Sequence, residues 1–155
     1  MKKILLYFIL LTVILCSGCA SKGPKVTMHA VCVSEFDYGS KASITLQIKE
    51  KPRKDTDNSA CYNCSIQFTG DDVLLFAEDG VDGYRPKGAE TDIYQFYSQV
   101  YYGDLNSHRA VAIDILPDMK TCVIDLPEDG LRYVASVDAE FDANEILELY
   151  AGVLP

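Results

Sequence analysis

The chain has 155 residues, of which 23 are acidic and 14 are basic, and its formal net charge is −9. Such a balance argues against binding to nucleic acid and against attraction to anionic lipid headgroups, because both of these partners are themselves negative. It favours a basic partner.

The first residues have the form of an export signal. Met1, Lys2 and Lys3 open the chain, and residues 4–15 are apolar except for Thr12. An apolar run of about a dozen residues fits the h-region of a signal peptide, whereas crossing a bilayer takes roughly 20 residues. We therefore expect residues 1–18 to be a signal peptide.

The sequence Leu-Cys-Ser-Gly-Cys at residues 15–19 follows this run directly. Small residues just before a cysteine, after an h-region, resemble the lipobox of bacterial lipoproteins. The resemblance implies a lipid on Cys19 and a membrane anchor. Because Ala20 is not the Asp that implies retention at the inner membrane, the resemblance also implies, for a Gram-negative cell, the outer membrane, facing the periplasm. The alternatives are a secretory signal cut near Ala20 or an uncleaved anchor.

The domain organisation follows from this leader. Residues 19–24 are expected to be a lipidated tether and residues 25–155 a single domain, a length that supports a core of its own. Lys2 and Lys3 leave with the signal peptide, so 12 basic residues face 23 acidic ones and the formal charge becomes −11.

Most of the domain is predicted to be short β-strands. Residues 42–48 alternate strictly, with Ile44, Leu46 and Ile48 on one face. The polar residues 50–60 and the Gly-, Asp- and Pro-rich residues 78–88 are predicted connections. The other predicted strands are residues 26–33, 65–68, 73–76, 110–116, 121–126 and 131–137.

Two segments are ambiguous between strand and helix. Residues 93–102 match a helical face at Ile93, Phe96 and Val100, but their many Tyr residues favour a strand. Residues 142–150 begin like a capping box, yet their Leu residues also alternate as in an edge strand. A strand is preferred for both segments.

This pattern predicts an all-β fold, namely a single immunoglobulin-like or transthyretin-like β-sandwich, and leaves open a short C-terminal helix. The turn at residues 127–130, followed by Tyr133, is similar to the entry into a late strand of fibronectin type III and other immunoglobulin-like domains. The resemblance implies that Tyr133 hydrogen-bonds back across the corner.

Four cysteines remain besides Cys19, namely Cys32, Cys61, Cys64 and Cys122. An even number in an oxidising compartment predicts two disulfides. If Tyr62 and Asn63 form a tight turn, Cys61 pairs with Cys64 and Cys32 with Cys122. If residues 61–64 are extended, each sulfur needs a different partner.

The Cys-x-x-Cys spacing also permits two other functions. A redox dithiol needs a stabilised thiolate, but the residues after Cys64 have the pattern of a strand and no basic residue lies nearby. A zinc site formed by His29, Cys32, Cys61 and Cys64 has plausible spacing. His29 and Cys32, however, are an odd number apart in a predicted strand and so point to opposite faces. We expect no metal.

No motif predicts catalysis. The sequence contains no Gly-x-Ser-x-Gly, His-Glu-x-x-His or phosphate loop, and its histidines are His29 and His108. His108 is interpreted as an exposed turn residue, and the acidic residues 78–83 as a turn rather than a calcium loop. We expect neither enzymatic activity nor a cofactor.

The Tyr-rich residues 93–102 are the best candidate for partner binding, since Tyr is favoured at interfaces. The alternative is plain packing, because Tyr is also a normal residue of a strand with one face in the core. If they form a strand, Ile93, Gln95, Tyr97, Gln99 and Tyr101 face outward. Tyr97 and Tyr101 are the predicted contact residues for a protein partner, with a basic partner favoured.

The predicted function is a lipid-anchored periplasmic module that binds protein. The layout resembles accessory lipoproteins of secretion machines and toxin-immunity proteins. One alternative is a thiol redox or metal-binding envelope protein that uses Cys61 and Cys64. Another is a structural envelope lipoprotein without a dedicated ligand.

Overall fold

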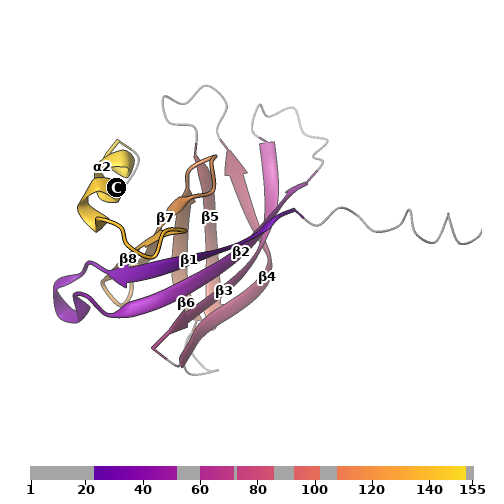
Figure 1. Ribbon diagram of the computed structural model, residues 1–155. Coiled ribbons are helices and arrows are strands. Elements are labelled where there is room, and N and C mark those ends of the chain that lie inside the picture. Colours follow the sequence, from indigo (N-terminus) through magenta and orange to yellow (C-terminus); the bar gives the residue numbers. More distant parts are fainter. Residues whose placement is uncertain (1–22, 52–59, 72, 86–92, 102–107, 153–155) are drawn as a thin grey trace, which may run out of the picture.

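The computed structural model describes residues 23–51, 60–71, 73–85, 93–101 and 108–152 (Figure 1). In this part of the chain, eight antiparallel strands follow one another around a closed barrel, and β8 pairs with β1. The strands are β1 (Lys25–Cys32), β2 (Lys41–Lys51), β3 (Ala60–Gly70), β4 (Val73–Arg85), β5 (Tyr94–Tyr101), β6 (His108–Ile115), β7 (Thr121–Leu126) and β8 (Leu131–Ser136).

The closed barrel corrects the predicted β-sandwich, whether immunoglobulin-like or transthyretin-like. Both architectures need short alternating strands joined by turns, so the sequence pattern does not separate them. The difference lies in the long-range pairing of β1 with β8, in which Ala30 lies opposite Ala135 and Cys32 opposite Tyr133. This pairing removes the free sheet edges that a sandwich would keep.

Side chains from all eight strands fill the barrel interior. Ile44, Leu46 and Ile48 of β2 are buried, which confirms the predicted alternation of this strand. An eight-stranded barrel is just wide enough for side chains to fill it. The interior cluster consists of Met28, Ala30, Cys32, Ile44, Leu46, Ile48, Cys64, Ile66, Phe68, Phe76, Val81, Phe96, Val111, Ile113, Ile115, Cys122, Ile124, Leu126, Tyr133 and Ala135.

Strand β4 is longer than the sequence predicts. It continues through Arg85, although residues 78–88 were expected to be a connection. A register shift against β3 between Cys64 and Ile66 gives β4 an extra residue, and Gly80 there adopts a φ of 80°. A bulge with Gly at positive φ lets a Gly- and Asp-rich segment stay within a strand.

Tyr133 lies in strand β8 of the closed barrel. Its ring packs inside the barrel, edge-on to Phe68 at a centroid distance of 5.0 Å. Its hydroxyl donates to Oδ2 of Asp37 at 3.4 Å. Asp37 belongs to η1 (Glu35–Asp37), the single 3-10 turn between β1 and β2. Tyr133 therefore fixes the β1–β2 connection against the end of the barrel.

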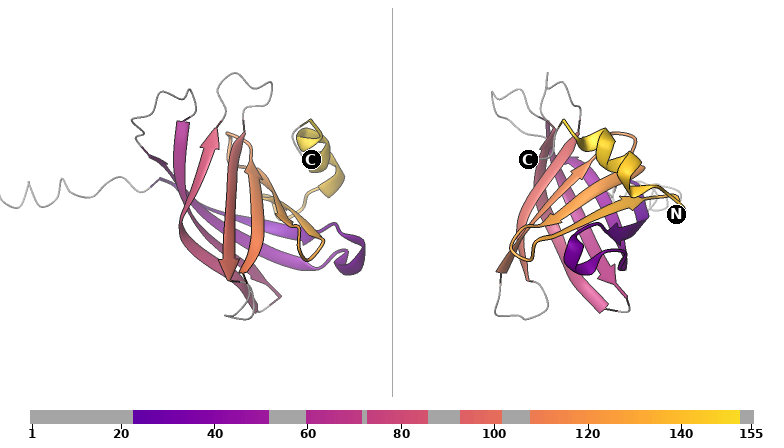
Figure 2. Two further views of the ribbon diagram at one scale, coloured as in Figure 1. Left: turned by 180° about the vertical axis from the view of Figure 1, so that it is seen from behind. Right: turned by 90° about the vertical axis from the view of Figure 1, so that its left-hand side faces the viewer.

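The C-terminal segment is a helix, α2 (Ala143–Tyr150), so the preference for a strand was wrong there. The Asp142 side chain caps it by accepting from the backbone N–H of Asn144 at 2.8 Å. Ile146 and Tyr150, one helical turn apart, pack on Val123 and Val134 of the outer barrel face. Figure 2 shows α2 lying across this face. Capping and burial on one face together outweigh the alternation.

Candidate functional site

A cleft of about 770 Å³ opens on the outer face of β5–β8, beside α2. Outward-facing residues of the four strands contribute to its floor, and Leu147 of α2 lies at its side. Most of its surface is apolar. The cleft is lined by Val33, Ser34, Tyr97, Ala112, Asp114, Asp125, Pro127, Gly130, Leu131, Arg132 and Leu147.

Asp114 is the most buried charged group of the cleft, with only 8% of its surface exposed. It lies directly opposite Gln95 in the pairing of β6 with β5, and Nε2 of Gln95 donates to its Oδ1 at 3.1 Å. Burial raises the pKa of Asp114, the Gln95 hydrogen bond lowers it, and the nearby charge of Asp125 raises it further. The positive charge of Arg132 lowers the pKa of Asp114, but the pKa remains raised overall.

Asp125 and Arg132 form a second polar pair on the same floor. They are also direct cross-strand neighbours, in β7 and β8. Nε of Arg132 lies 2.5 Å from Oδ1 of Asp125, and Nη2 lies 3.1 Å from Oδ2. This two-pronged geometry occupies both carboxylate oxygens and fixes the guanidinium plane. With all three groups ionised, the floor carries one uncompensated negative charge, on Asp114.

Tyr97 lines the cleft with 64% of its surface exposed. It follows the predicted parity of this strand, since its neighbour Phe96 is buried in the barrel. Ile93 departs from that parity: it was expected to face outward and is 2% exposed, just before β5 begins. The side chain of Tyr101 lies outside the described residues, so its predicted contact role stays a prediction.

The helical wall of the cleft is held by Tyr150. Its hydroxyl donates to the backbone carbonyl of Thr121 at 2.8 Å and accepts from the backbone N–H of Leu116 at 3.1 Å. Burial raises the pKa of this phenol well above its usual range, so it stays protonated and able to donate. These bonds tie α2 to β7 and to the turn before it.

The three cysteines whose side chains the structure describes are separate from this cleft. Cys32, Cys64 and Cys122 are free thiols buried in the barrel interior. Burial raises the pKa of Cys64 to about 12 and raises that of Cys122 further, with a contribution from Cys64. Thiolate formation is therefore disfavoured at both.

The strand register bears on the predicted disulfides. Residues 61–64 are extended within β3, with Tyr62 opposite Gly83, and do not form the tight turn needed for a local Cys61–Cys64 pair. Cys32 and Cys122 belong to β1 and β7, which β8 separates. Two strand spacings exceed the 7 Å or so that a disulfide tolerates between Cα atoms. The side chain of Cys61 lies outside the described residues, and the two disulfides remain a prediction.

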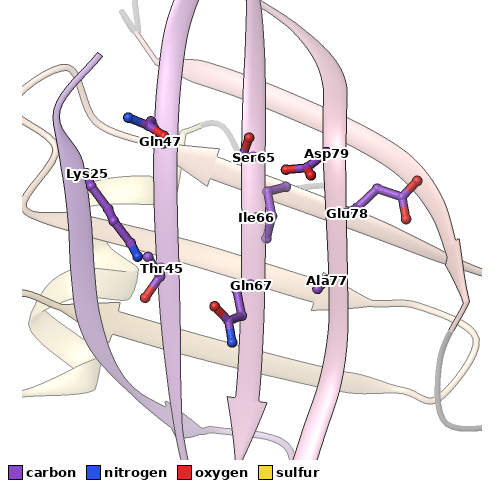
Figure 3. Close-up of a pocket in the computed structure, with 9 residues that line it drawn as sticks. All are labelled: Lys25, Thr45, Gln47, Ser65, Ile66, Gln67, Ala77, Glu78 and Asp79. Atoms are coloured by element: carbon purple, nitrogen blue, oxygen red, sulfur yellow. The ribbon is translucent and has the colours of Figure 1, made fainter. Parts of the chain in front are cut away.

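A second, smaller hollow of about 390 Å³ lies on the outer face of β1–β4 (Figure 3). Thr45, Gln47 and Gln67 lie between Lys25 on one margin and Glu78 on the other. Gln47 already donates to the carbonyl of Gly23 at 2.8 Å. Polar side chains partly satisfied by neighbouring groups are typical of a hydrated strand face.

The strand alternation placed Gln95 on the outward face of its strand, but the sequence did not draw attention to Asp114, Asp125 or Arg132. Asp114 is the one charged residue in the otherwise apolar residues 110–116. A single carboxylate within an apolar strand was the signal that the sequence offered, because Asp is rarely buried without a partner. Its interpretation required the position of α2, which strand alternation does not supply.

The described residues thus form an up-and-down β-barrel with a filled interior and a mostly apolar cleft outside, lined by Asp114 and by the Asp125–Arg132 ion pair. Within the same residues, no three His, Cys, Asp or Glu side chains gather as metal ligands would, and no helix is both long and apolar enough to cross a membrane. No protein-family model, curated protein or solved structure matches the chain.

Proposed function

We propose that the protein is a lipid-anchored periplasmic module that binds another protein, and that its contact surface is the cleft between α2 and β5–β8. The observation that carries the proposal is exposed Tyr97 beside an apolar hollow of about 770 Å³ with a polar floor. Aromatic anchors at apolar hollows with a few fixed polar groups are typical of protein interfaces.

The position of the chain start supports this proposal. In Figures 1 and 2, the beginning of β1 at Lys25 and helix α2 lie on opposite sides of the barrel. A lipid on Cys19, joined to β1 by the short tether of residues 19–24, would hold the start of β1 near the bilayer. The cleft would then face away from the membrane, where a periplasmic partner can reach it.

The charge of the chain indicates the kind of partner. The part after residue 18 carries a formal charge of −11, which attracts a basic protein and speeds encounter with it. The alternative of a thiol redox protein is less well supported, because burial disfavours the reactive thiolate at Cys64.

Site-specific photocrosslinking in the intact envelope tests the proposal. A photoreactive amino acid replaces Tyr97 in the full chain, and in a matched variant it replaces Gln67, an exposed residue on the far outer face of β3. We expect a discrete adduct with one protein from position 97 and none from position 67. If position 97 gives no adduct, or if both positions give the same adducts, the cleft is not the contact surface.

A further inference from the structure

We propose that the floor of the cleft is a receptor for one cationic side chain, an arginine or a lysine of the partner, and that Asp114 is the residue that selects it. This inference rests on the proposed function and names the chemistry of its ligand. It depends on three charged groups that line the cleft and on the amide of Gln95, which donates to one of them.

The unequal pairing of the two carboxylates carries the argument. Both oxygens of Asp125 are engaged by Arg132, at 2.5 and 3.1 Å. Asp114 receives one hydrogen bond from the neutral amide of Gln95 at 3.1 Å. An ionised carboxylate has about four acceptor positions, so Asp114 retains capacity for further donors. A cation in the cleft would supply both the donors and the missing charge.

The apolar walls fit the rest of such a side chain. Ala112, Leu131 and Leu147 line the cleft around the floor. The methylene groups of arginine or lysine can pack on them while the charged end reaches Asp114. Tyr97 at the same cleft offers a ring face to a cation. An acidic or purely apolar side chain would leave Asp114 without compensation.

Binding of a cation is coupled to a proton. Burial favours the neutral acid of Asp114, with Asp125 opposing ionisation and Arg132 assisting it. When a cation binds to the neutral acid, the carboxyl O–H bond breaks and the proton leaves to solvent, and the carboxylate then accepts from the cation. Affinity should therefore rise with pH through the titration of Asp114. The phenol of Tyr97 is the other titratable group that lines the cleft.

Two blocked tripeptides provide the probe: Leu-Arg-Leu, and the same peptide with citrulline, which matches arginine in shape but is neutral. The side-chain amide of Gln95 in the full chain, held in detergent, reports binding by its nitrogen–proton NMR signal. We expect saturable shifts with the arginine peptide, weaker at acidic pH, and none with the citrulline peptide.

Matched variants complete the test. Asp114→Asn should lower the affinity for the arginine peptide on the order of tenfold. Asp79→Asn removes the same charge from an exposed position in β4 and should leave the affinity unchanged. Equal binding of the citrulline peptide, equal losses in the two variants, or no shift at Gln95 would overturn the inference. If position 97 gives an adduct but the arginine peptide does not bind, the proposed function is supported and the inference about Asp114 is wrong.

Discussion

Gln95 and Asp114 face each other across β5 and β6, and the amide of Gln95 donates to the carboxylate at 3.1 Å. The amide orients the carboxylate but brings no charge to balance it. Asp114 is 8% exposed, so water compensates its charge only weakly. The pair is a costly feature of the outer barrel face, and its cost is measurable as a dependence of stability on pH.

Asp114→Asn should stabilise the protein at neutral pH, by on the order of 1 kcal/mol. The pKa of Asp114 is raised in the folded state, so the folded protein holds the proton more tightly than the unfolded chain does. The wild-type free energy of unfolding therefore decreases as pH rises from the unfolded pKa of about 3.9 through the folded pKa. Asp114→Asn does not lose this stability as pH rises, because its side-chain amide does not ionise. Urea unfolding of both proteins over a range of pH measures the difference, and an advantage that persists below the unfolded pKa would contradict the explanation.

Tyr150→Phe should destabilise the protein by about 1–2 kcal/mol. The variant keeps the ring in its buried site but removes the hydroxyl that bonds Leu116 and Thr121. The backbone N–H of Leu116 then loses its partner, while the packing of α2 is retained. Thermal unfolding measures the effect.

The matched control for Tyr150→Phe is Leu149→Ala, at a neighbouring helix residue that is 60% exposed. It should change stability by less than about 0.5 kcal/mol. If the two variants lose equal stability, the hydroxyl bonds are not what holds α2.

The difference between predictable and unpredictable features of this fold is visible in β2 and β8. The alternation of Ile44, Leu46 and Ile48 predicts strand β2 and its buried face correctly, because burial on one side of a strand is a local pattern. The closure of the barrel depends on Ala30 meeting Ala135. No local property of these two small residues encodes that meeting, so a sandwich and a barrel were equally compatible with the sequence.

The candidate site divides in the same way. The outward direction of Tyr97 follows from the parity of its strand and was predictable. The role proposed for Asp114 was not, because the cleft around it is lined by neighbouring strands and by a helix far away in the sequence. The C-terminal segment contains both a capping signal at Asp142 and alternating Leu residues. The outer face of β7 and β8, which buries Ile146 and Tyr150, decides between them.

Gly83→Ala should destabilise the barrel by more than about 2 kcal/mol. A Cβ at Gly83 would lie 2.2 Å from Cδ1 of Phe96 and 2.7 Å from the backbone oxygen of Gln95. The pairing of β4 with β5 is recorded only at Gly83–Phe96 and Tyr84–Gln95 among the described residues, so the clash falls on the shortest ladder of the barrel. Hydrogen exchange should show the loss of protection concentrated in β4 and β5.

Gly152→Ala is the control for this change, because no atom lies within 4 Å of a Cβ built there. It should leave both stability and exchange nearly unchanged. Uniform loss of protection over all strands in Gly83→Ala would show that β4 and β5 do not open separately.

The buried cysteines provide the last prediction. In the folded protein, Cys32, Cys64 and Cys122 should not react with a soluble thiol reagent, because each is buried and because burial raises the pKa of Cys64 to about 12. After unfolding in denaturant without reductant, the same three should react, since the structure has all three as free thiols. Alkylation followed by peptide mass spectrometry assigns each site. Thiols that react in the folded state would show that the barrel interior opens readily. If no thiol reacts even after unfolding, the two disulfides predicted from the sequence are present in place of the three free thiols of the structure.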